Sequence, residues 1–463
     1  MSQLSPLDGV FLSMDTPETP AVIGGLAILD PNTCPEAFDH GRFVEFASER
    51  LALCPRFGWK VAEVPLGLDL PYWVKDEELR VEHHIRRVAV PSPGGAEELS
   101  ELAGHLFSMP LDRSRPLWEM VVIEGLQGGR VALLWKLHHC MMDGESGAGL
   151  VELLFDLAPE PAQRPLVPQA DAAAPGEAPS LGTLIRNGFA NTVERNRALA
   201  RNAVAAVSAL VESARSDEES VTAPRVSLNG VVSARRAIAW ARVPLAHVIE
   251  IKQELGVSVN DVILGITGGA MRRYLEDRGE LPEETLYASM PISTRAKGDK
   301  TVGNQVRDAS VDWGTDVVDP VERVLRINAS TRKVKSQVQR GGPSFIQGAA
   351  ESFIPGATRL FMRASAAAAD RIPLPANCVV SNVRMTDFPL YIAGAKIVGM
   401  VPMSMLAPTQ GVNITVVTYD GDLHFGVIAD PRLCEQPWHI ADGVGKSLVE
   451  LQEAMDSPRD AVA

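Results

Sequence analysis

A strand-like run that ends in two adjacent histidines constrains this chain more than any other segment. Residues 131–137 are rich in β-forming side chains and follow a Gly-Gly turn pair, so they predict a strand. His138 and His139 come next, and the turn pair Asp143-Gly144 follows. Neighbouring side chains of a strand point to opposite faces, which predicts one packed histidine and one that faces solvent or substrate.

The residues after this motif predict a helix with a surface open to close approach. From residue 145 to residue 157, leucines recur at helical spacing, and small residues stand near the start of the segment. Small residues let a ligand come close to the backbone. Together with Gly144, they suggest a base that is presented at a strand end beside a bound substrate.

A second His-His pair serves as an internal control. His83-His84 is followed by Ile-Arg-Arg-Val and lacks the Asp-Gly turn. An isolated pair of histidines is more often buried and hydrogen-bonded than catalytic, so we assign this pair a structural role. The complete pattern His-His-x-x-x-Asp-Gly is far more restrictive than the dipeptide.

The complete motif resembles the active-site sequence of CoA-dependent acyltransferases of the chloramphenicol acetyltransferase type and of peptide-synthetase condensation domains. Further segments resemble, in the same order, those of bacterial wax ester synthase/diacylglycerol acyltransferases. These segments are Leu-Ser-Pro-Leu-Asp at 4–8, Arg-Pro-Leu-Trp-Glu at 115–119, Asn-Asp-Val-Ile-Leu at 260–264 and Pro-Leu-Tyr-Ile-Ala-Gly at 389–394.

The resemblance implies a mixed α/β (α+β) fold. It has two chloramphenicol acetyltransferase-like domains, each a mixed β-sheet flanked by helices, with the active-site channel between them. We place the N-terminal domain at 1–158 and the C-terminal domain at 226–463. Between them, 159–225 is a linker or crossover that is rich in Pro and Ala and carries an amphipathic helix. Local patterns predict helices at 244–255 and 260–275 and strands at 235–240, 287–292, 305–311 and 413–419.

The resemblance also implies an acyl-CoA-dependent O-acyltransferase. Such an enzyme transfers a long-chain acyl group to diacylglycerol or a long-chain alcohol and gives triacylglycerol or wax ester. His139 is then the general base for direct attack by the alcohol, and His138 supports it. Asp143 either orients His139 or fixes the turn. Acyl-CoA is a co-substrate, and we expect no bound cofactor and no metal.

Asn260 and Asp261 allow two interpretations. Either residue can cap the helix that follows, by accepting backbone hydrogen bonds at its N-terminus. The resemblance implies instead that both matter for activity, by holding the second domain's face of the channel.

The reaction also needs a hydrogen-bond donor for the tetrahedral oxyanion. The candidates are Ser381, Asn382, Asn413 and Thr415. The first two lie in a Ser-Asn-Val stretch that resembles the family's, although Arg384-Met385 replaces the Gly-Pro pair expected there. Arg384 either contacts a CoA phosphate or is a solvated loop cation.

Composition limits the partners and the compartment. The formal net charge of −14 disfavours nucleic acid, although a local basic patch can still contact CoA phosphates or anionic lipid. The five cysteines show no Cys-x-x-Cys pair, which favours reduced thiols in the cytoplasm. One of them, Cys140, lies inside the motif, but nothing nearby marks it as an activated nucleophile.

Membrane contact is expected to be peripheral. We see no signal peptide, and prolines interrupt the uncharged stretch 397–419, so we predict no transmembrane helix. The segments 181–215 and 345–363 either contact lipid or pack against the protein body. The protein would act in the cytoplasm, at the inner membrane face or on lipid inclusions.

Two alternatives to lipid synthesis stay open. A protein of the same fold can acylate another hydroxyl or amine acceptor. It can also be a non-catalytic protein that binds lipid or coats lipid droplets.

Overall fold

Two large sheets dominate the computed structural model, which describes residues 2–141, 153–160, 180, 182–187, 191, 222–293, 306–340 and 373–457. The first sheet has the strand order β12-β13-β2-β7-β6-β5 within these ranges. Only its β5–β6 pair is parallel. Its strands are β2 (Val22–Asp30), β5 (Ile85–Ala89), β6 (Trp118–Glu124), β7 (Val131–His138), β12 (Tyr391–Ile392) and β13 (Ala395–Met403).

The second sheet has the order β10-β9-β11-β14-β15-β8, and β11 runs parallel to both of its neighbours. Its strands are β8 (Ala237–Pro244), β9 (Tyr287–Ser293), β10 (Val306–Asp312), β11 (Cys378–Thr386), β14 (Val412–Tyr419) and β15 (Asp422–Ala429). A small third sheet joins β1 (Ser2–Gln3), β4 (Tyr72–Lys75) and β3 (Trp59–Ala62).

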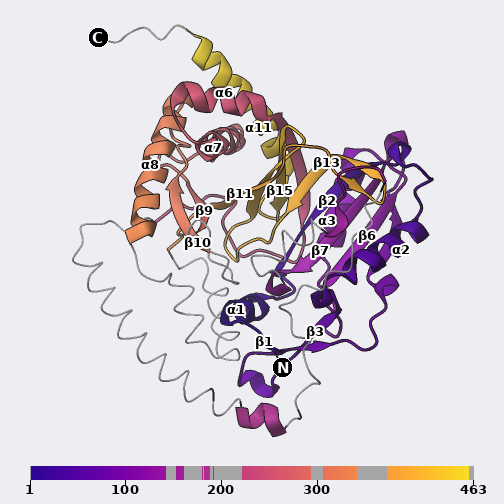
Figure 1. The fold of residues 1–463 in the computed structure, drawn as a ribbon. Helices are drawn as coiled ribbons and strands as arrows, with labels where there is room; N and C mark the ends of the chain where they lie inside the picture. Colours follow the sequence, from indigo (N-terminus) through magenta and orange to yellow (C-terminus); the bar gives the residue numbers. More distant parts are fainter. Residues whose placement is uncertain are drawn as a thin grey trace.

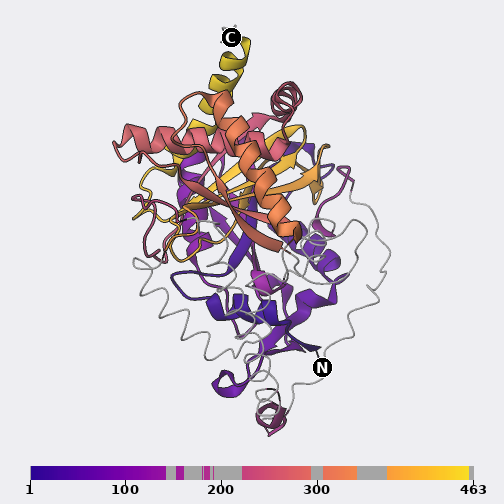
Figure 2. The same cartoon turned by 90° about the vertical axis from the view of Figure 1, so that its left-hand side faces the viewer.

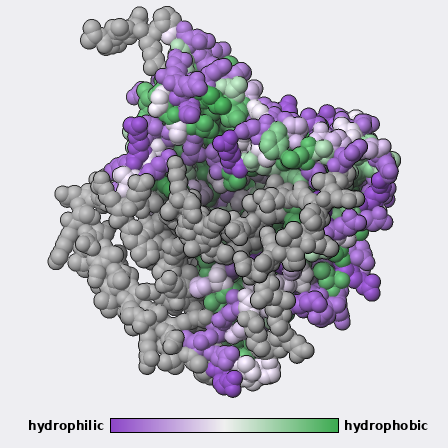
Figure 3. All heavy atoms as spheres, in the orientation of Figure 1, coloured by the Kyte–Doolittle hydropathy of each residue, from purple (hydrophilic) through white to green (hydrophobic). Residues whose placement is uncertain are grey.

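Helices cover the two large sheets (Figure 1). The second sheet packs against α6 (Leu245–Leu255), α7 (Val259–Asp277), α8 (Pro320–Arg340) and α11 (Pro437–Asp456). The N-terminal half holds α1 (Pro6–Met14), α2 (His40–Leu51) and α3 (Ala96–Ser108). Short 3-10 turns are η1 (Pro31–Thr33), η2 (Pro55–Gly58), η3 (Pro65–Gly67), η4 (Val81–His83), η5 (Gln127–Gly129) and η6 (His139–Met141). On the face drawn in Figure 3, hydrophilic residues dominate the described surface.

Strand β13 links the two halves, because it comes from the C-terminal part of the chain and pairs with β2 of the first sheet. It also crosses β15 closely. A Cβ atom added to Gly426 would lie 1.8 Å from the carbonyl oxygen of Pro402, so this crossing requires a glycine. The division at residues 158 and 226 stays a prediction, but sheet membership does not follow it, since β12 and β13 lie beyond residue 226.

Each half has a buried core of its own, and a third core contains residues from both halves. The first contains residues of α2, β6 and β7, and the second those of α7, α11 and β15. The third joins Val22 and Leu26 to Ile238 and Ile428, which come from the two halves. Burial of these apolar side chains is the main term that opposes separation of the halves.

Most local predictions are confirmed. The helices at 244–255 and 260–275 are α6 and α7, and the strands at 287–292, 305–311 and 413–419 are β9, β10 and β14. The strand predicted to begin at residue 235 begins at Ala237. Arg236 is buried, and its guanidinium donates to the carbonyl oxygens of Ser233 and Glu18 instead of joining the ladder.

Other predictions lie wholly or largely outside the described residues. These are the helix at 145–157 and the segments 181–215 and 345–363, of which the structure describes 153–157, 182–187 and 191. Among the helices of the described ranges, none has the length and apolar character to cross a bilayer.

A buried ion pair anchors the segment that follows the histidine motif. Nη2 of Arg50 on α2 donates to both carboxylate oxygens of Asp156, at 2.9 and 3.0 Å, and both residues are buried. The backbone of Asp156 also exchanges two hydrogen bonds with Tyr391 on β12, at 2.8 and 2.9 Å. Residues 153–160 are therefore tied both to α2 and to the strand that crosses from the other half.

We expect Asp156→Ala to lower the free energy of unfolding by about 3–5 kcal/mol, because it leaves the Arg50 guanidinium buried without this carboxylate. Chemical denaturation measures the change. Glu36→Ala is the matched control, since it breaks an exposed pair with Arg42 and should cost less than about 1 kcal/mol. Equal effects of the two variants would contradict the anchoring role of Asp156.

Candidate active site

The two histidines of the motif lie on either side of a strand end. His138 is the last residue of β7 and pairs with Val22 on β2, whereas His139 opens the 3-10 turn η6. The backbone N–H of His139 donates to the carbonyl of Ala21 at 2.8 Å. Because the chain turns here, strand alternation no longer fixes the second side chain. His138 is buried and His139 is half-buried, which agrees with the predicted asymmetry.

His138 is held by a carboxylate. Its Nδ1 accepts a hydrogen bond from the backbone N–H of Cys140 at 3.1 Å, and its Nε2 lies 3.6 Å from Oδ2 of Asp15. Burial alone would raise the pKa of Asp15. His138, Arg113 and the backbone N–H of Ala21 outweigh burial and lower that pKa to about 2. Asp15 is therefore charged at neutral pH and faces the Nε2 edge of His138.

His139 is kept neutral by its surroundings. Its ring stacks on Phe11 of α1, with centroids 3.7 Å apart and an angle of 18° between the planes. Burial lowers the pKa of His139 to about 4, and the neighbouring His138 adds to this shift, while the carbonyl of His139 itself opposes it. A neutral imidazole retains a lone pair, so His139 can accept a proton at neutral pH.

Arg113 connects the N-terminal helix to this site. Its guanidinium donates to Oδ2 of Asp15 at 2.8 Å, to the carbonyl of Leu12 at 3.0 Å and to Glu63 at 3.0 Å. It thus ties the C-terminal end of α1 to the segment that leads into Pro116-Leu117-Trp118. Sequence reasoning missed Phe11, Asp15 and Arg113. No local spacing marks them, and only the family-like segment at 4–8 pointed to this part of the chain.

Cys140 has no features of a nucleophile. It is fully buried in the core of the first half, and burial raises the pKa of its thiol well above the ordinary value. A neutral thiol at this place attacks a thioester poorly. The structure therefore agrees with the sequence interpretation, which set Cys140 aside.

The carboxyl ends of β11 and β14 lie where the two halves meet. On β14, Val416 belongs to the core of the second half and Val417 to that of the first half. The first-half core also contains Cys140 and Met141 of η6, the turn that carries His139. One end of the second sheet therefore packs against the same core as the histidine turn.

The four candidate oxyanion donors differ in their partners. Thr415 donates its hydroxyl to Oδ1 of Asn413 at 2.9 Å, and Nδ2 of Asn413 donates to the carbonyl of Met405 at 3.2 Å. Nδ2 of Asn382 lies 3.4 Å from Oδ1 of Asn260. Ser381 is half-buried and pairs with Thr415 across β11 and β14, and its hydroxyl has no hydrogen bond to any described residue.

The side chain of Ser381 lies on the face of the second sheet that is turned toward the first half. Side chains alternate along β14, so Ile414 and Val416 enter the helical side, where the core of the second half lies. Thr415, which pairs with Ser381, is on the opposite face with Val417. Ser381 therefore lies on the face of the second sheet that continues into the core of the histidine turn.

Asn260 and Asp261 have different surroundings. Ser258, and not Asn260, caps α7, and Asp261 completes a capping box with it. Oδ1 of Asp261 accepts a hydrogen bond from Thr331 at 2.7 Å and Oδ2 accepts one from Asn328 at 2.8 Å, both on α8. Burial would raise the pKa of Asp261, but these hydrogen bonds outweigh it and lower that pKa. The capping prediction is thus correct for Asp261 and wrong for Asn260.

Three residues remain from the motif and from the segment that follows the Ser-Asn-Val stretch: Asp143, Gly144 and Arg384. Asp143 and Gly144 lie outside the described residues. The side chain of Arg384 is 80% exposed and pairs with Asp387 at 2.8 Å, which fits a solvated loop cation. Among the described residues, no group of three His, Cys, Asp or Glu side chains could hold a metal ion.

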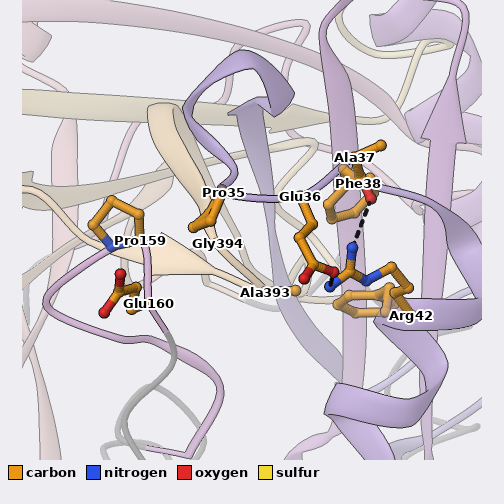
Figure 4. A pocket seen from close by; sticks show the side chains of 10 residues that line it. Pro35, Glu36, Ala37, Phe38, Arg42, Pro159, Glu160, Ala393 and Gly394 are labelled. Atoms are coloured by element: carbon orange, nitrogen blue, oxygen red, sulfur yellow. Dashed lines mark hydrogen bonds and ion pairs between the residues drawn. The ribbon is translucent and has the colours of Figure 1, made fainter.

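A small pocket lies away from the histidines, between the η1–α2 segment, residues 159–160 and the β12–β13 turn (Figure 4). Its volume is about 190 Å³, and Glu36 and Arg42 pair at its rim. Gly394 closes the turn with a φ of +88°, and a Cβ atom there would lie 3.1 Å from the carbonyl oxygen of Pro159. No predicted site residue lines this pocket, and it is too small for a long acyl chain.

The comparisons with known proteins cover nearly the whole chain. Residues 4–263 match the wax ester synthase/diacylglycerol acyltransferase catalytic domain, and residues 302–452 match the C-terminal domain of that family. A Mycobacterium tuberculosis protein, named as a candidate diacylglycerol O-acyltransferase, is 34% identical over 98% of this chain and 91% of its own length. A second M. tuberculosis protein with the same kind of name is 31% identical over 98% of this chain and 99% of its own length.

Solved structures agree with the mixed α/β fold of two domains. The wax ester synthase/diacylglycerol acyltransferase from Marinobacter aquaeolei VT8 has a TM-score of 0.69 and 26% identity, over 98% of this chain and 100% of that chain. The first condensation domain of the calcium-dependent antibiotic synthetase has a TM-score of 0.56 and 14% identity, over 99% and 97%, and supports the fold alone. The chain belongs to the wax ester synthase/diacylglycerol acyltransferase family.

Proposed function

We propose that this protein transfers a long-chain acyl group from acyl-CoA to diacylglycerol or a long-chain alcohol, with His139 as the general base. The observation that carries the proposal is a neutral histidine, stacked on Phe11, at the motif position of a chain whose residues 4–263 match the family's catalytic domain. The products would be triacylglycerol or wax ester, and CoA would be released.

The reaction needs one proton carrier and no acyl-enzyme. His139 takes the proton of the acceptor hydroxyl as its oxygen bonds to the thioester carbon, which gives a tetrahedral oxyanion. Collapse of this species breaks the carbon–sulfur bond, and the imidazolium returns its proton to the CoA thiolate. The Phe11 stack and the Asp15–His138 contact hold the ring in place during both steps.

Ser381 is our candidate for the oxyanion donor. It lies on the face of the second sheet that continues into the core of η6, and its hydroxyl has no hydrogen bond to the described residues. Thr415 donates its hydroxyl hydrogen to Oδ1 of Asn413, and Nδ2 of Asn413 donates to the carbonyl oxygen of Met405. The base then comes from one half of the chain and the donor from the other, which fits a channel between two domains that divide near residues 158 and 226.

The acceptor lipid implies where the protein works. Diacylglycerol and long-chain alcohols partition into lipid, so we propose that the protein meets them at a membrane surface or a lipid inclusion in the cytoplasm. Attachment would be peripheral.

His139→Ala should lower acyl transfer by about 10²- to 10⁴-fold, because it removes the base, and the protein should keep its fold, since the packing that is lost is one ring stacked on Phe11. Purified protein is incubated with labelled palmitoyl-CoA and hexadecanol, diacylglycerol or no acceptor, and labelled ester and free CoA are quantified. His83→Ala is the control, since it removes an exposed histidine of the other His-His pair and should leave the rate unchanged.

The outcome separates the candidate functions. Ester from wild type with only one acceptor identifies the activity, and near-normal transfer by a folded His139→Ala protein would eliminate the mechanism. Tight binding of acyl-CoA without ester from any acceptor would favour another acceptor class or a non-catalytic lipid-binding protein.

The acid limb of kcat/KM should lie near pH 4 in the wild type, because burial holds the pKa of His139 at about 4 and the neutral form is the active one. Phe11→Ala opens the ring to water, so the limb should move up toward the ordinary histidine value of about 6.5. Rates are measured over pH ranges in which circular dichroism shows both proteins to be folded. A limb at the same pH in both proteins would contradict the role of Phe11.

Ser381→Ala should lower kcat by about 10²- to 10³-fold with little change in KM, because an oxyanion donor acts mainly in the transition state. Thr386→Ala, which removes a hydroxyl at the far end of the same strand, serves as the control. Steady-state kinetics with saturating acceptor give both constants. Unchanged kcat in Ser381→Ala would move the donor role to another group.

A further inference from the structure

The distal half of α8 is a basic surface in an acidic protein. Arg332, Lys333 and Lys335 lie within four residues of one another, and after Glu322 the helix contains no further acidic residue. The whole chain carries a formal net charge of −14. We call these three residues the α8 basic turn.

The side chains of the basic turn reach the surface, whereas Arg326 in the proximal half of the helix is paired with carboxylates. Arg332 and Lys333 are exposed and Lys335 is half-buried. None of the three forms an ion pair with a residue in the described ranges. By contrast, Arg326, two turns earlier, pairs with Asp312 at 2.8 Å and with Asp316 at 2.7 Å. Unpaired cations on a surface helix attract anions.

A hydrogen-bond network connects the basic turn to the region where the two halves meet. Thr331, directly before Arg332, donates to Asp261 on α7 at 2.7 Å. The neighbouring Asn260 contacts Met290 on β9 and lies 3.4 Å from Nδ2 of Asn382 on β11. Both views of the fold show α8 descending from the helical layer toward the N-terminal half (Figures 1 and 2).

Strands β9 and β11 of the second sheet diverge beside Asn260. β9 and β11 pair only at Ala288–Cys378 and Ser289–Val379, and beyond these residues each strand continues with its other neighbour alone. Asn260 contacts Met290, one residue past the last shared pair on β9, and Asn382, three residues past it on β11. The helical side and the Ser381 side of the sheet are therefore not sealed from one another by a continuous ladder here.

We propose that the α8 basic turn binds the phosphate groups of acyl-CoA, and that the pantetheine arm passes beside Asn260 and Asn382 toward Ser381. This inference rests on the proposed function. CoA carries a diphosphate and a 3′-phosphate, and a long flexible arm separates them from the thioester. A phosphate site remote from His139 is what this chemistry requires. The Asp261 network fixes the position of the turn, which gives the Asn-Asp motif a task outside the chemical step.

The test is the double variant Arg332→Gln/Lys333→Gln. At low salt, its kcat/KM for palmitoyl-CoA should fall about tenfold through KM, with kcat unchanged, because the lost charges act in binding and not in the chemical step. Added salt should lower kcat/KM of the wild type toward that of the variant, because it screens the attraction between the cations and the phosphates. The control is Lys252→Gln/Lys446→Gln, which removes the same charge from α6 and α11.

A substrate without phosphate distinguishes this site from a general defect. With the N-acetylcysteamine thioester of the same acyl chain, the wild type, the variant and the control should react equally. Equal losses on both thioesters, or no loss on palmitoyl-CoA, would overturn the proposal.

Calorimetric titration with CoA keeps the inference separate from the proposed function. If the wild type transfers no acyl group to any acceptor, the proposed function fails. CoA binding that is about tenfold weaker in Arg332→Gln/Lys333→Gln than in the control would still support the phosphate site. Unchanged CoA binding with lost sedimentation on phosphatidylglycerol vesicles would instead assign the basic turn to anionic lipid and overturn the proposal.

Discussion

The proposed site depends on the contacts that the charged carboxylate of Asp15 makes. This carboxylate faces His138 and accepts hydrogen bonds from Arg113 and from the backbone N–H of Ala21. The carbonyl of Ala21 in turn accepts a hydrogen bond from the backbone N–H of His139. One carboxylate thus joins the end of α1, the start of β2 and the end of β7. Because Arg113 also binds the C-terminal end of α1, it fixes the helix that brings Phe11 onto the His139 ring. Loss of this charge would free the histidine turn without removing a catalytic group.

Burial and reactivity are balanced at His139. In its proposed role as the base for an alcohol, His139 would gain from a higher pKa, yet burial lowers that pKa to about 4. The benefit of burial is that the His139 ring stays neutral at neutral pH and so keeps the lone pair that the proposed base needs. The imidazolium that would form on His139 needs stabilisation, and the charged Asp15 beside His138 is one group of the proposed site that can supply it.

Sequence reasoning found the elements and missed the contacts between them. The strand before the motif, helices α6 and α7, and strands β8, β9, β10 and β14 follow from local hydrophobic patterns and capping residues, and the structure confirms them. Phe11, Asp15 and Arg113 meet the motif from about 25 to 130 residues away, and no periodicity encodes such contacts. The same holds for β13, whose partner β2 lies in the other half. Asn260 and Asp261 were recognised as a unit, but only the hydrogen bonds to α8 separate their roles.

Strand β13 and a shared core join the two halves of the chain and oppose their separation. β13 pairs with β2 from Lys396 to Met403, with one shift of register between Ile397 and Gly399, and it crosses β15 so closely that the crossing requires Gly426. A shared core adds apolar burial on both sides of the crossing. Parting the two sheets would expose this shared core and pull β13 away from β15, so the loss of apolar contacts opposes it. The proposed site for CoA on the outer end of α8, with its approach beside Asn260, would let the substrate enter without parting this shared core.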